Sequence, residues 1–298
     1  VVRRPSAAFP VRRLATFNAE SVVLIFLMAS LYRVDVLLLL PLHGSRETGF
    51  YKAALLVAEF LWLVPFALQT VLLHSSAELW SRDQFERITT VASGATRYTL
   101  ALTTLLALGI AALAPAFLGL YFGQEFVVAS DALVLLLPGA LGFAVARPIF
   151  AIGQGKGELR LLIGATGVAA LLNLCLNLVL IPPYGMSGAA VATSLGYGSM
   201  VGLHVAAARL LGFDPLADLR PGRFLAVAGL AGVIIVGFGR VLSSPVLALL
   251  VVPPVGGFVY GVAALRFGLI DVRELDGPIE SLPAPTREPV RKLLRTLA

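Results

Sequence analysis

Charged residues are scarce in this sequence: aspartate, glutamate, lysine and arginine together make up only 13% of its 298 residues. Ordinary soluble domains contain roughly 25%. Hydrophobic residues make up 58% of the chain, and its mean hydropathy is +0.90. A soluble chain of this length could bury a large core, but it could not hide this much apolar surface. The composition therefore excludes an ordinary soluble domain and predicts that the solvent of this chain is a lipid bilayer.

Cysteine and histidine are also scarce. The single cysteine, Cys175, lies inside an apolar stretch, so no disulfide can form within the chain and no redox or metal site is indicated. The three histidines, His43, His74 and His204, are far apart in the sequence and form no metal-ligating pattern. The sequence also lacks a nucleophile triad, a His-Glu-x-x-His motif and a Walker-type glycine-rich loop. We therefore predict a protein that is not an enzyme and that uses no metal or other cofactor.

Long apolar stretches account for most of the sequence. Eight of them are close to the ~20 residues that a helix needs to cross a bilayer. We expect membrane-spanning helices at residues 19–41, 50–74, 98–121, 126–149, 160–181, 187–210, 223–242 and 245–267. The predicted fold class is an all-α polytopic membrane bundle of eight transmembrane helices.

The basic residues predict the orientation of this bundle. Most of the 23 lysine and arginine residues fall in segments that would share one side of the membrane with the N-terminus. The opposite side would carry only Arg46, Lys52 and Arg240. Basic residues accumulate on the cytoplasmic side of membrane proteins, so both termini are predicted to be cytoplasmic. The same rule explains the net charge of +6, and no nucleic-acid partner is expected.

The C-terminal tail, residues 268–298, contains a basic amphipathic pattern. Its apolar positions at helical spacing are Val290, Leu293, Leu294 and Leu297, and the basic residues between them are Arg291, Lys292 and Arg295. This pattern predicts a helix that either binds anionic lipid headgroups or packs against the cytoplasmic loops. Residues 1–17 are predicted to be a cytoplasmic lead-in.

Few ionisable residues lie within the predicted spans. Arg33 and Asp35 fall in the first span, Glu59 in the second and Asp131 in the fourth. Such residues are costly in lipid, so they usually line a cavity or pair with one another. At ~1.5 Å per residue, Arg33 and Glu59 lie at similar depths on neighbouring antiparallel spans. We therefore expect Arg33 to face Glu59 and Asp35 to point elsewhere.

Two interpretations of these charges remain open. In the functional one, Arg33 attracts an anionic substrate group, and Asp35 or Glu59 binds a coupling proton or sodium ion. In the structural one, Arg33 and Glu59 merely fix the packing of two helices, and a hydroxyl or water caps Asp35. Asn173 and Asn177, four residues apart, share a helix face, where amides commonly bond between helices. The candidate substrate- or ion-binding residues are Arg33, Asp35, Glu59, Asp131, Asn173 and Asn177.

A second basic group surrounds the connection between the fourth and fifth spans. Arg147, Lys156 and Arg160 lie close together in the sequence, and Gln154, Gly155 and Gly157 favour a turn between them. We interpret the three basic residues as anchors in a cytoplasmic loop. The alternative is a phosphate-binding site.

Residues 173–194 predict a membrane hairpin. An apolar helix is followed by Pro182-Pro183-Tyr184-Gly185 and then by a segment rich in glycine and alanine. The prolines disfavour continuation of the helix, and Gly185 permits the left-handed backbone that a reversal needs. The small residues that follow allow another helix to approach closely, which is how helices associate in lipid.

Two stretches resemble polysaccharide flippases of the multidrug/oligosaccharidyl-lipid/polysaccharide exporter superfamily. Residues 177–193 closely resemble the family pattern Asn-x-x-Leu-Ile-Pro-x-Tyr-Gly-x-x-Gly-Ala-Ala-x-Ala-Thr. The second stretch is similar to the start of the second half of these proteins, where an aspartate precedes a Gly-x-Tyr-x-x-Ala pattern. Its matching residues are Asp35, Gly49, Tyr51 and Ala54.

The resemblance implies translocation of lipid-linked oligosaccharides or polysaccharides across the cytoplasmic membrane by alternating access between two helical bundles. Cationic residues in the central cavity would bind the sugar and its phosphates, a role that Arg33 would match. Residues 18–212 would form the second bundle and residues 213–267 two additional transmembrane helices. An N-terminal bundle is then expected to be missing, in keeping with a chain that begins with valine rather than methionine.

The implied partners are a lipid-linked glycan, membrane lipids and a coupling proton or sodium ion. Two alternatives remain open. One is a proton- or sodium-coupled multidrug or small-molecule exporter, and the other is a membrane scaffold that does not transport.

Overall fold

The computed structural model describes residues 11–242, 244–271, 276, 280 and 283–297, and these residues form helices and connections without a β-strand. The side chains of 13, 285, 290, 293, 295 and 297 are also outside the description. The elements in chain order are α1 (Val11–Glu59), the 3-10 helix η1 (Phe60–Trp62), α2 (Leu63–Ser81), α3 (Phe85–Tyr121), the 3-10 helix η2 (Gln124–Ala129), α4 (Ser130–Gly155), α5 (Arg160–Leu211), α6 (Pro221–Val241), α7 (Pro245–Arg266) and α9 (Ala284–Leu297).

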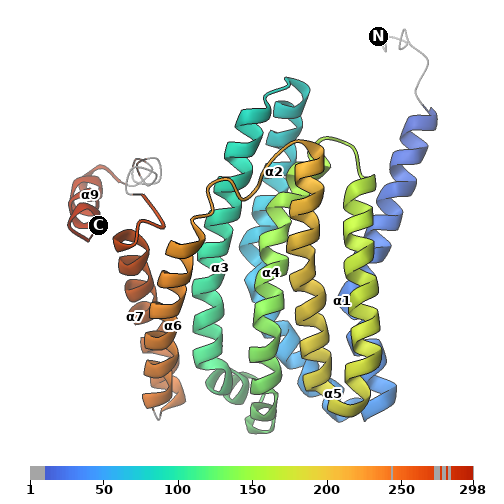
Figure 1. The fold of residues 1–298 in the computed structure, drawn as a ribbon. Helices are drawn as coiled ribbons and strands as arrows, with labels where there is room; N and C mark the ends of the chain where they lie inside the picture. Colours follow the sequence, from blue (N-terminus) through green and yellow to red (C-terminus); the bar gives the residue numbers. More distant parts are fainter. Residues whose placement is uncertain (1–10, 243, 272–275, 277–279, 281–282, 298) are drawn as a thin grey trace, which may run out of the picture.

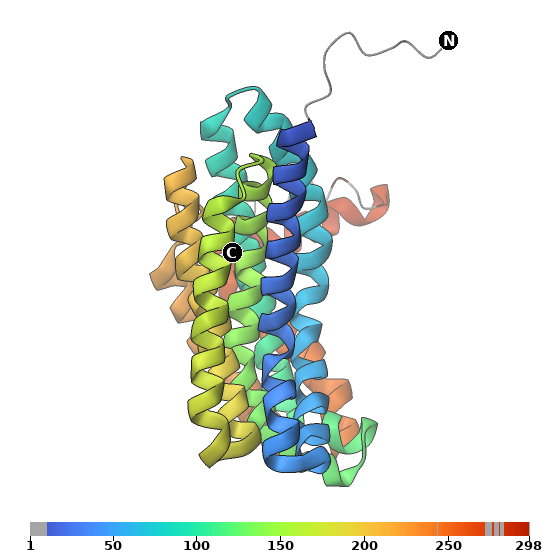
Figure 2. The same cartoon turned by 90° about the vertical axis from the view of Figure 1, so that its right-hand side faces the viewer.

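Two of these helices reverse direction at a glycine. Gly44 in α1 has φ 81° and ψ 176°, and Gly185 in α5 has φ 55° and ψ −131°. Both conformations are unfavourable for a residue with a Cβ atom. Figures 1 and 2 show that α1 and α5 each run to one end of the bundle, turn and run back. The hairpin predicted at residues 173–194 is therefore present, with its reversal at Gly185.

Six helical segments among the described residues are long and apolar enough to cross a membrane. The prediction of an all-α membrane bundle is confirmed, whereas the number of membrane crossings and the side of the termini stay predictions. Several predicted boundaries were too narrow, because α1 begins at Val11 rather than at residue 19, and α3 begins at Phe85 rather than at residue 98. The polar residues that precede these two apolar runs are compatible with a helix, so each helix begins before its apolar stretch.

Helix α4 lies at the centre of the bundle and packs against α1, α2, α3 and α5 (Figure 1). Its closest approach is to the second half of α5. A Cβ atom added to Gly139 would lie 2.2 Å from the Cα atom of Ser194, and one added to Gly142 would lie 3.1 Å from the Cα atom of Gly198. The backbones therefore meet without intervening side chains, as expected for helices that associate in lipid.

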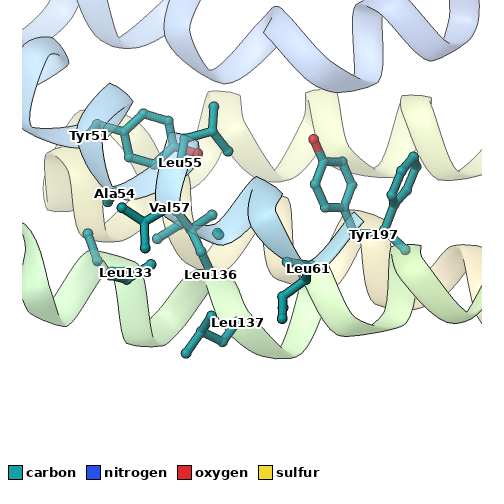
Figure 3. Packing of buried hydrophobic residues seen from close by; sticks show 14 of the residues in the cluster. Tyr51, Ala54, Leu55, Val57, Leu61, Leu133, Leu136, Leu137 and Tyr197 are labelled. Atoms are coloured by element: carbon teal, nitrogen blue, oxygen red, sulfur yellow. The ribbon is translucent and has the colours of Figure 1, made fainter. Parts of the chain in front are cut away.

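The largest buried hydrophobic cluster fills the space between α1, α4 and α5. Figure 3 shows Tyr51 and Leu61, which follow the reversal at Gly44, beside Leu133 of α4 and Tyr197 of α5. Helices α6 and α7 stand at the side of this bundle, where they pack against each other and against α3. The core around Tyr51 thus belongs to α1–α5, and α6 and α7 are an addition to it.

The C-terminal tail contains the predicted helix, α9. The side chains of Val290, Leu293, Arg295 and Leu297 lie outside the described residues, so the predicted apolar and basic faces of this helix stay a prediction. Within the described part, Arg291 forms ion pairs with Glu288 and Asp276, both at 3.4 Å. Residues 1–10 of the predicted lead-in also lie outside the described residues.

Candidate functional site

Asp35 is the most deeply buried acidic side chain of the described chain, with 0% of its surface exposed. Its Oδ2 atom accepts hydrogen bonds from the hydroxyl of Tyr51 at 2.5 Å and from Oγ1 of Thr193 at 3.1 Å. Its Oδ1 atom accepts a hydrogen bond from the backbone N–H of Val36 at 2.7 Å. The two hydroxyls also lie within hydrogen-bond distance of each other, at 3.4 Å. All the partners of the carboxyl group are neutral.

The backbone reversals bring these three residues together. Asp35 precedes Gly44 in α1 and Tyr51 follows it, so the turn sets the two side chains on antiparallel segments. Thr193 follows the second reversal, at Gly185, in a part of α5 where Ala189 and neighbouring alanines are fully buried. The two stretches that carry the resemblance to flippases therefore meet at one carboxylate.

Asn173 and Asn177 lie on the first half of α5, and both side chains are fully buried. Asn173 donates a hydrogen bond from Nδ2 to the carbonyl of Ala192 at 3.3 Å, next to Thr193. Asn177 donates from Nδ2 to the backbone carbonyl of Asn173 at 2.9 Å and to its Oδ1 at 3.2 Å. The Oδ1 atom of Asn177 is buried and has no hydrogen-bond partner among the described residues. Asn173 thus bonds across the α5 hairpin, Asn177 bonds to Asn173 on its own half of the helix, and Asn177 Oδ1 is an unused acceptor within the described residues.

The other predicted site residues do not join this cluster. The Arg33 side chain is exposed, whereas Asp35, two residues further along the helix, is buried. Within the described residues, Arg33 forms neither a hydrogen bond nor an ion pair with half-buried Glu59, although it is the charge that interacts most strongly with Glu59. Asp131 lies exposed in the first turn of α4. The described residues therefore contain no Arg33–Glu59 ion pair, and the expectation that the two side chains face each other stays a prediction.

Arg147 occupies a position that the sequence prediction missed. It lies inside α4 with only 7% of its surface exposed, and not in the connection between α4 and α5. Its Nη1 atom donates to Oε1 of Gln69 at 3.0 Å, and its Nη2 atom donates to the hydroxyl of Tyr32. Its guanidinium carbon lies 4.1 Å from the ring centre of Phe66 and 4.3 Å from that of Phe143. The interpretation of Arg147 as a loop anchor is wrong.

The other two basic residues of that group do lie at the connection between α4 and α5. Lys156 Nζ donates to the backbone carbonyl of Leu211 at 3.2 Å and lies 5.3 Å from the ring centre of Trp80. Arg160 forms an ion pair with Glu20 at 3.2 Å. Arg147 was misplaced because α4 continues to Gly155, six residues beyond the predicted end of its span, which moves Arg147 from the edge of the membrane into the bundle.

Two cavities of similar volume lie in different parts of the bundle, and only the second contains one of these residues. The first, of about 440 Å³, is apolar and lies between α3, α7 and the segment around η1; Phe60, Gly109, Phe117 and Pro253 are among its lining residues. The second, of about 420 Å³, is lined by Arg147 with polar and apolar side chains of α1, α2 and α4. No group of three or more His, Cys, Asp or Glu side chains in the described part of the chain is placed to hold a metal ion.

No protein-family model matches this chain. Two archaeal relatives match a little over half of it. The probable low-salt glycan biosynthesis flippase Agl15 of Haloferax volcanii is 28% identical over 175 residues, which are 57% of this chain and 36% of the relative. The uncharacterized membrane protein MJ1068 of Methanocaldococcus jannaschii is 26% identical over 165 residues, which are 55% of this chain and 32% of the relative.

Among solved structures, the lipid II flippase MurJ in an inward closed conformation has a similar fold. The TM-score is 0.61, the sequence identity is 16%, and the match covers 80% of this chain and 51% of the MurJ chain. The chain therefore has the fold of about half of a MurJ molecule, and it spans about a third of the length of the two archaeal relatives. Its long apolar helices and this likeness both indicate a multi-pass membrane protein.

Proposed function

We propose that this chain translocates lipid-linked glycan precursors across the cytoplasmic membrane, as the part of a flippase that contains the second helical bundle. The observation that carries the proposal is the likeness of 80% of the chain to half of the lipid II flippase MurJ. The name of the Haloferax volcanii relative, a probable glycan biosynthesis flippase, supports the same class of substrate. The first, N-terminal bundle, on the same polypeptide or on a partner, would complete the cavity.

The proposed topology has eight membrane crossings with both termini in the cytoplasm. Six apolar helical segments become eight crossings because α1 and α5 each reverse at a glycine, at Gly44 and Gly185. Helices α1–α5 would then provide six crossings, and α6 and α7 the remaining two. The excess of basic residues on one side supports the cytoplasmic placement of the termini.

The cluster around Asp35 is proposed to bind the coupling proton or sodium ion. A carboxylate buried in a membrane helix is costly unless a positive charge compensates it. Arg33 is exposed and does not pair with it, and its observed partners are hydroxyls and a backbone N–H. A proton or a small cation would supply the missing charge. Carboxylate, hydroxyl and amide oxygens are the ligands that hard cations prefer, and Asn177 Oδ1 is an unused acceptor on the adjoining helix.

The apolar cavity beside α3 and α7 is proposed to hold part of the lipid carrier. Its volume of about 440 Å³ and its lining of aliphatic and aromatic residues suit a hydrocarbon chain. Burial of each methylene group there would contribute about 0.8 kcal/mol relative to water, and much less relative to lipid. The cavity would therefore guide the hydrocarbon chain of the lipid along the bundle and would not bind it tightly.

Complementation tests this function. The full-length protein, expressed in a host that lacks its own flippase for lipid-linked glycans, should restore glycan display at the cell surface. Asp35→Asn should abolish the restoration at an equal amount of protein in the membrane, and Glu125→Gln, which changes an exposed carboxylate in η2, should not. Failure of the wild-type protein would refute the proposed function. Full restoration by Asp35→Asn would refute only the proposed role of Asp35.

A further inference from the structure

The reversals of α1 and α5 meet at one end of the bundle. Figures 1 and 2 show the two turns side by side, at the end remote from the start of α1. His43 and Glu47 flank Gly44, where α1 reverses, and the Nδ1 atom of His43 lies 3.3 Å from Oε2 of Glu47. The two side chains are 25% and 32% exposed, so water and protons can reach them. They therefore form an ion pair at the turn whenever His43 is protonated.

The same two side chains also contact α5, on both sides of its reversal at Gly185. The Nε2 atom of His43 lies 2.9 Å from the backbone carbonyl oxygen of Ile181, and a carbonyl can only accept, so Nε2 is the donor. The Oε1 atom of Glu47 accepts a hydrogen bond from the backbone N–H of Met186 at 2.7 Å. A Cβ atom added to Gly185 would overlap the Glu47 carboxylate. The pair thus bonds to the chain before and after the α5 reversal.

The charges of this pair match the helix ends that they contact. Ile181 lies near the end of the first half of α5, where the helix carbonyls carry a partial negative charge. Met186 begins the second half, where the N–H groups carry a partial positive charge. The helix dipole stabilises an imidazolium group at the first position and a carboxylate at the second. Both contacts with α5 are therefore strongest when His43 and Glu47 are both charged.

The geometry selects the protonated form of His43. Both of its ring nitrogens face oxygen acceptors, namely the carbonyl of Ile181 and the carboxylate of Glu47. A neutral imidazole has a single N–H, so while Nε2 donates to Ile181 the lone pair of Nδ1 would face the carboxylate. An imidazolium group donates to both. Histidine usually changes charge between about pH 5 and 8, so a pH change in this range switches the contact with Glu47.

The surroundings of His43 leave Glu47 as its charged partner. Helix α5 has no Asp, Glu, Lys or Arg between Arg160 and Arg209, and its turn contains one titratable residue, the exposed Tyr184. The guanidinium group of Arg46 lies over an aromatic ring of its own helix. The other charged side chains near this end of α1–α5 are all exposed to solvent: Arg46, Lys52, Glu125 of η2 and Asp131 of α4. Solvent screens exposed charges, so the state of the pair depends mainly on His43 itself.

We propose that His43 and Glu47 form a pH-sensitive latch between the two hairpins, closed when His43 is protonated and loosened when it is neutral. The latch lies close to the Asp35 cluster, because Thr193 follows Met186 by seven residues, about 10 Å at ~1.5 Å per residue. In the proposed topology this end of the bundle faces away from the cytoplasm. The pH on that side would then set how firmly the second half of α5 is held against α1.

Hydrogen–deuterium exchange of the full-length protein in detergent tests the latch. The readout is the peptide that contains Met186, whose N–H is released when the latch opens. Wild type and His43→Gln are compared at about pH 5.5 and about pH 8, on either side of the usual titration of histidine. Glutamine can still donate to Ile181 but does not titrate. Because both substitutions below lie outside the peptide, the intrinsic exchange chemistry cancels at each pH.

The peptide should exchange about threefold more slowly in the wild type than in His43→Gln at the lower pH, the size expected for one charge at a helix end. At the higher pH the two proteins should exchange equally. Glu47→Gln keeps an oxygen for the N–H of Met186 but removes the charge, so it should behave like His43→Gln. The matched control is His74→Gln: this exposed histidine of α2 bonds only within its own helix, to the carbonyl of Thr70, and its variant should keep the wild-type pH dependence.

A second measurement leaves the latch residues in place. Spin labels at two exposed turn positions, Ser45→Cys and Tyr184→Cys in a Cys175→Ser background, report the distance between the hairpins. The distribution of distances should broaden from the lower to the higher pH. Identical distributions, or an exchange ratio between wild type and His43→Gln that is the same at both pH values, would overturn the latch. Neither readout requires translocation, so failure of the proposed function would leave both results unchanged.

Discussion

Substitution of Gly139 by alanine gives a direct test of the packing between α4 and α5. The added Cβ atom would lie 2.2 Å from Ser194 Cα and 2.9 Å from the backbone carbonyl oxygen of Ser194. Ordinary contacts between such atoms begin near 3.4 Å, so the two helices would have to separate by about 1 Å. The separation would also stretch the hydrogen bond from Gly139 N to Ser194 Oγ, which is now 3.1 Å. Backbone atoms cannot yield as a flexible side chain would.

Overpacking of this kind typically costs about 1–3 kcal/mol. Each kcal/mol lowers the melting temperature of a protein of this size by roughly 2 °C or more, so we expect a decrease of about 2–6 °C. Thermal unfolding in detergent measures the effect. The matched control is Gly202→Ala on α5, where an added Cβ atom would have no neighbour within 4 Å. A Gly139→Ala protein as stable as the wild type would show that α4 and α5 do not meet as the structure places them.

Three further substitutions test other parts of the bundle. Tyr51→Phe removes a hydrogen bond to the buried Asp35 carboxyl group; it should cost about 1–3 kcal/mol, and an unchanged melting temperature would contradict the contact. Gly185→Ala places a Cβ atom at φ 55° and should reduce the yield of monodisperse protein in gel filtration, because the left-handed backbone disfavours a side chain. Arg97→Gln breaks the 2.9 Å ion pair with Asp218 in the segment between α5 and α6; limited proteolysis should then cut that segment faster, and an equal rate would count against an anchoring role.

Much of the bundle could be predicted from the sequence because a bilayer imposes few solutions on an apolar chain. The length of each apolar run located the membrane helices, and Pro182 with Gly185 located the α5 hairpin. The position of Gly44 could not be predicted as sharply, because it lies among polar residues that are compatible with both a loop and a continuing helix.

The site was harder to predict because depth along a helix does not determine which way a side chain points. Arg33 and Glu59 were predicted to face each other because they lie at similar depths. Arg33 and Asp35, however, are two positions apart and therefore about 200° apart around the helix. The helix thus buries Asp35 in the core and leaves Arg33 exposed. A hydroxyl or water cap on Asp35 is part of the structural interpretation, and the structure contains two such hydroxyls, of Tyr51 and Thr193. The partners of Asp35 could not be derived from spacing, because Thr193 reaches Asp35 only after α5 has reversed.

Arg147 was misplaced by the error in one helix boundary. A basic residue near the end of an apolar run is usually a membrane anchor. The sign of its true position was the pair of turn residues Gly155 and Gly157, several positions later, since they place the end of the helix well beyond Arg147. Pro148 pointed the other way, because a residue before proline disfavours helical backbone.

The role of the Asp35 cluster in translocation is tested most directly in vesicles that contain the full-length protein and a fluorescent lipid-linked disaccharide. A membrane-impermeant quencher measures how fast the lipid moves between leaflets with and without a sodium or proton gradient. We predict that the gradient accelerates movement in the wild type and in Glu125→Gln, and that Asp35→Asn loses the acceleration. Equal, gradient-dependent movement in Asp35→Asn and the wild type would contradict the claim that the buried carboxylate binds the coupling ion.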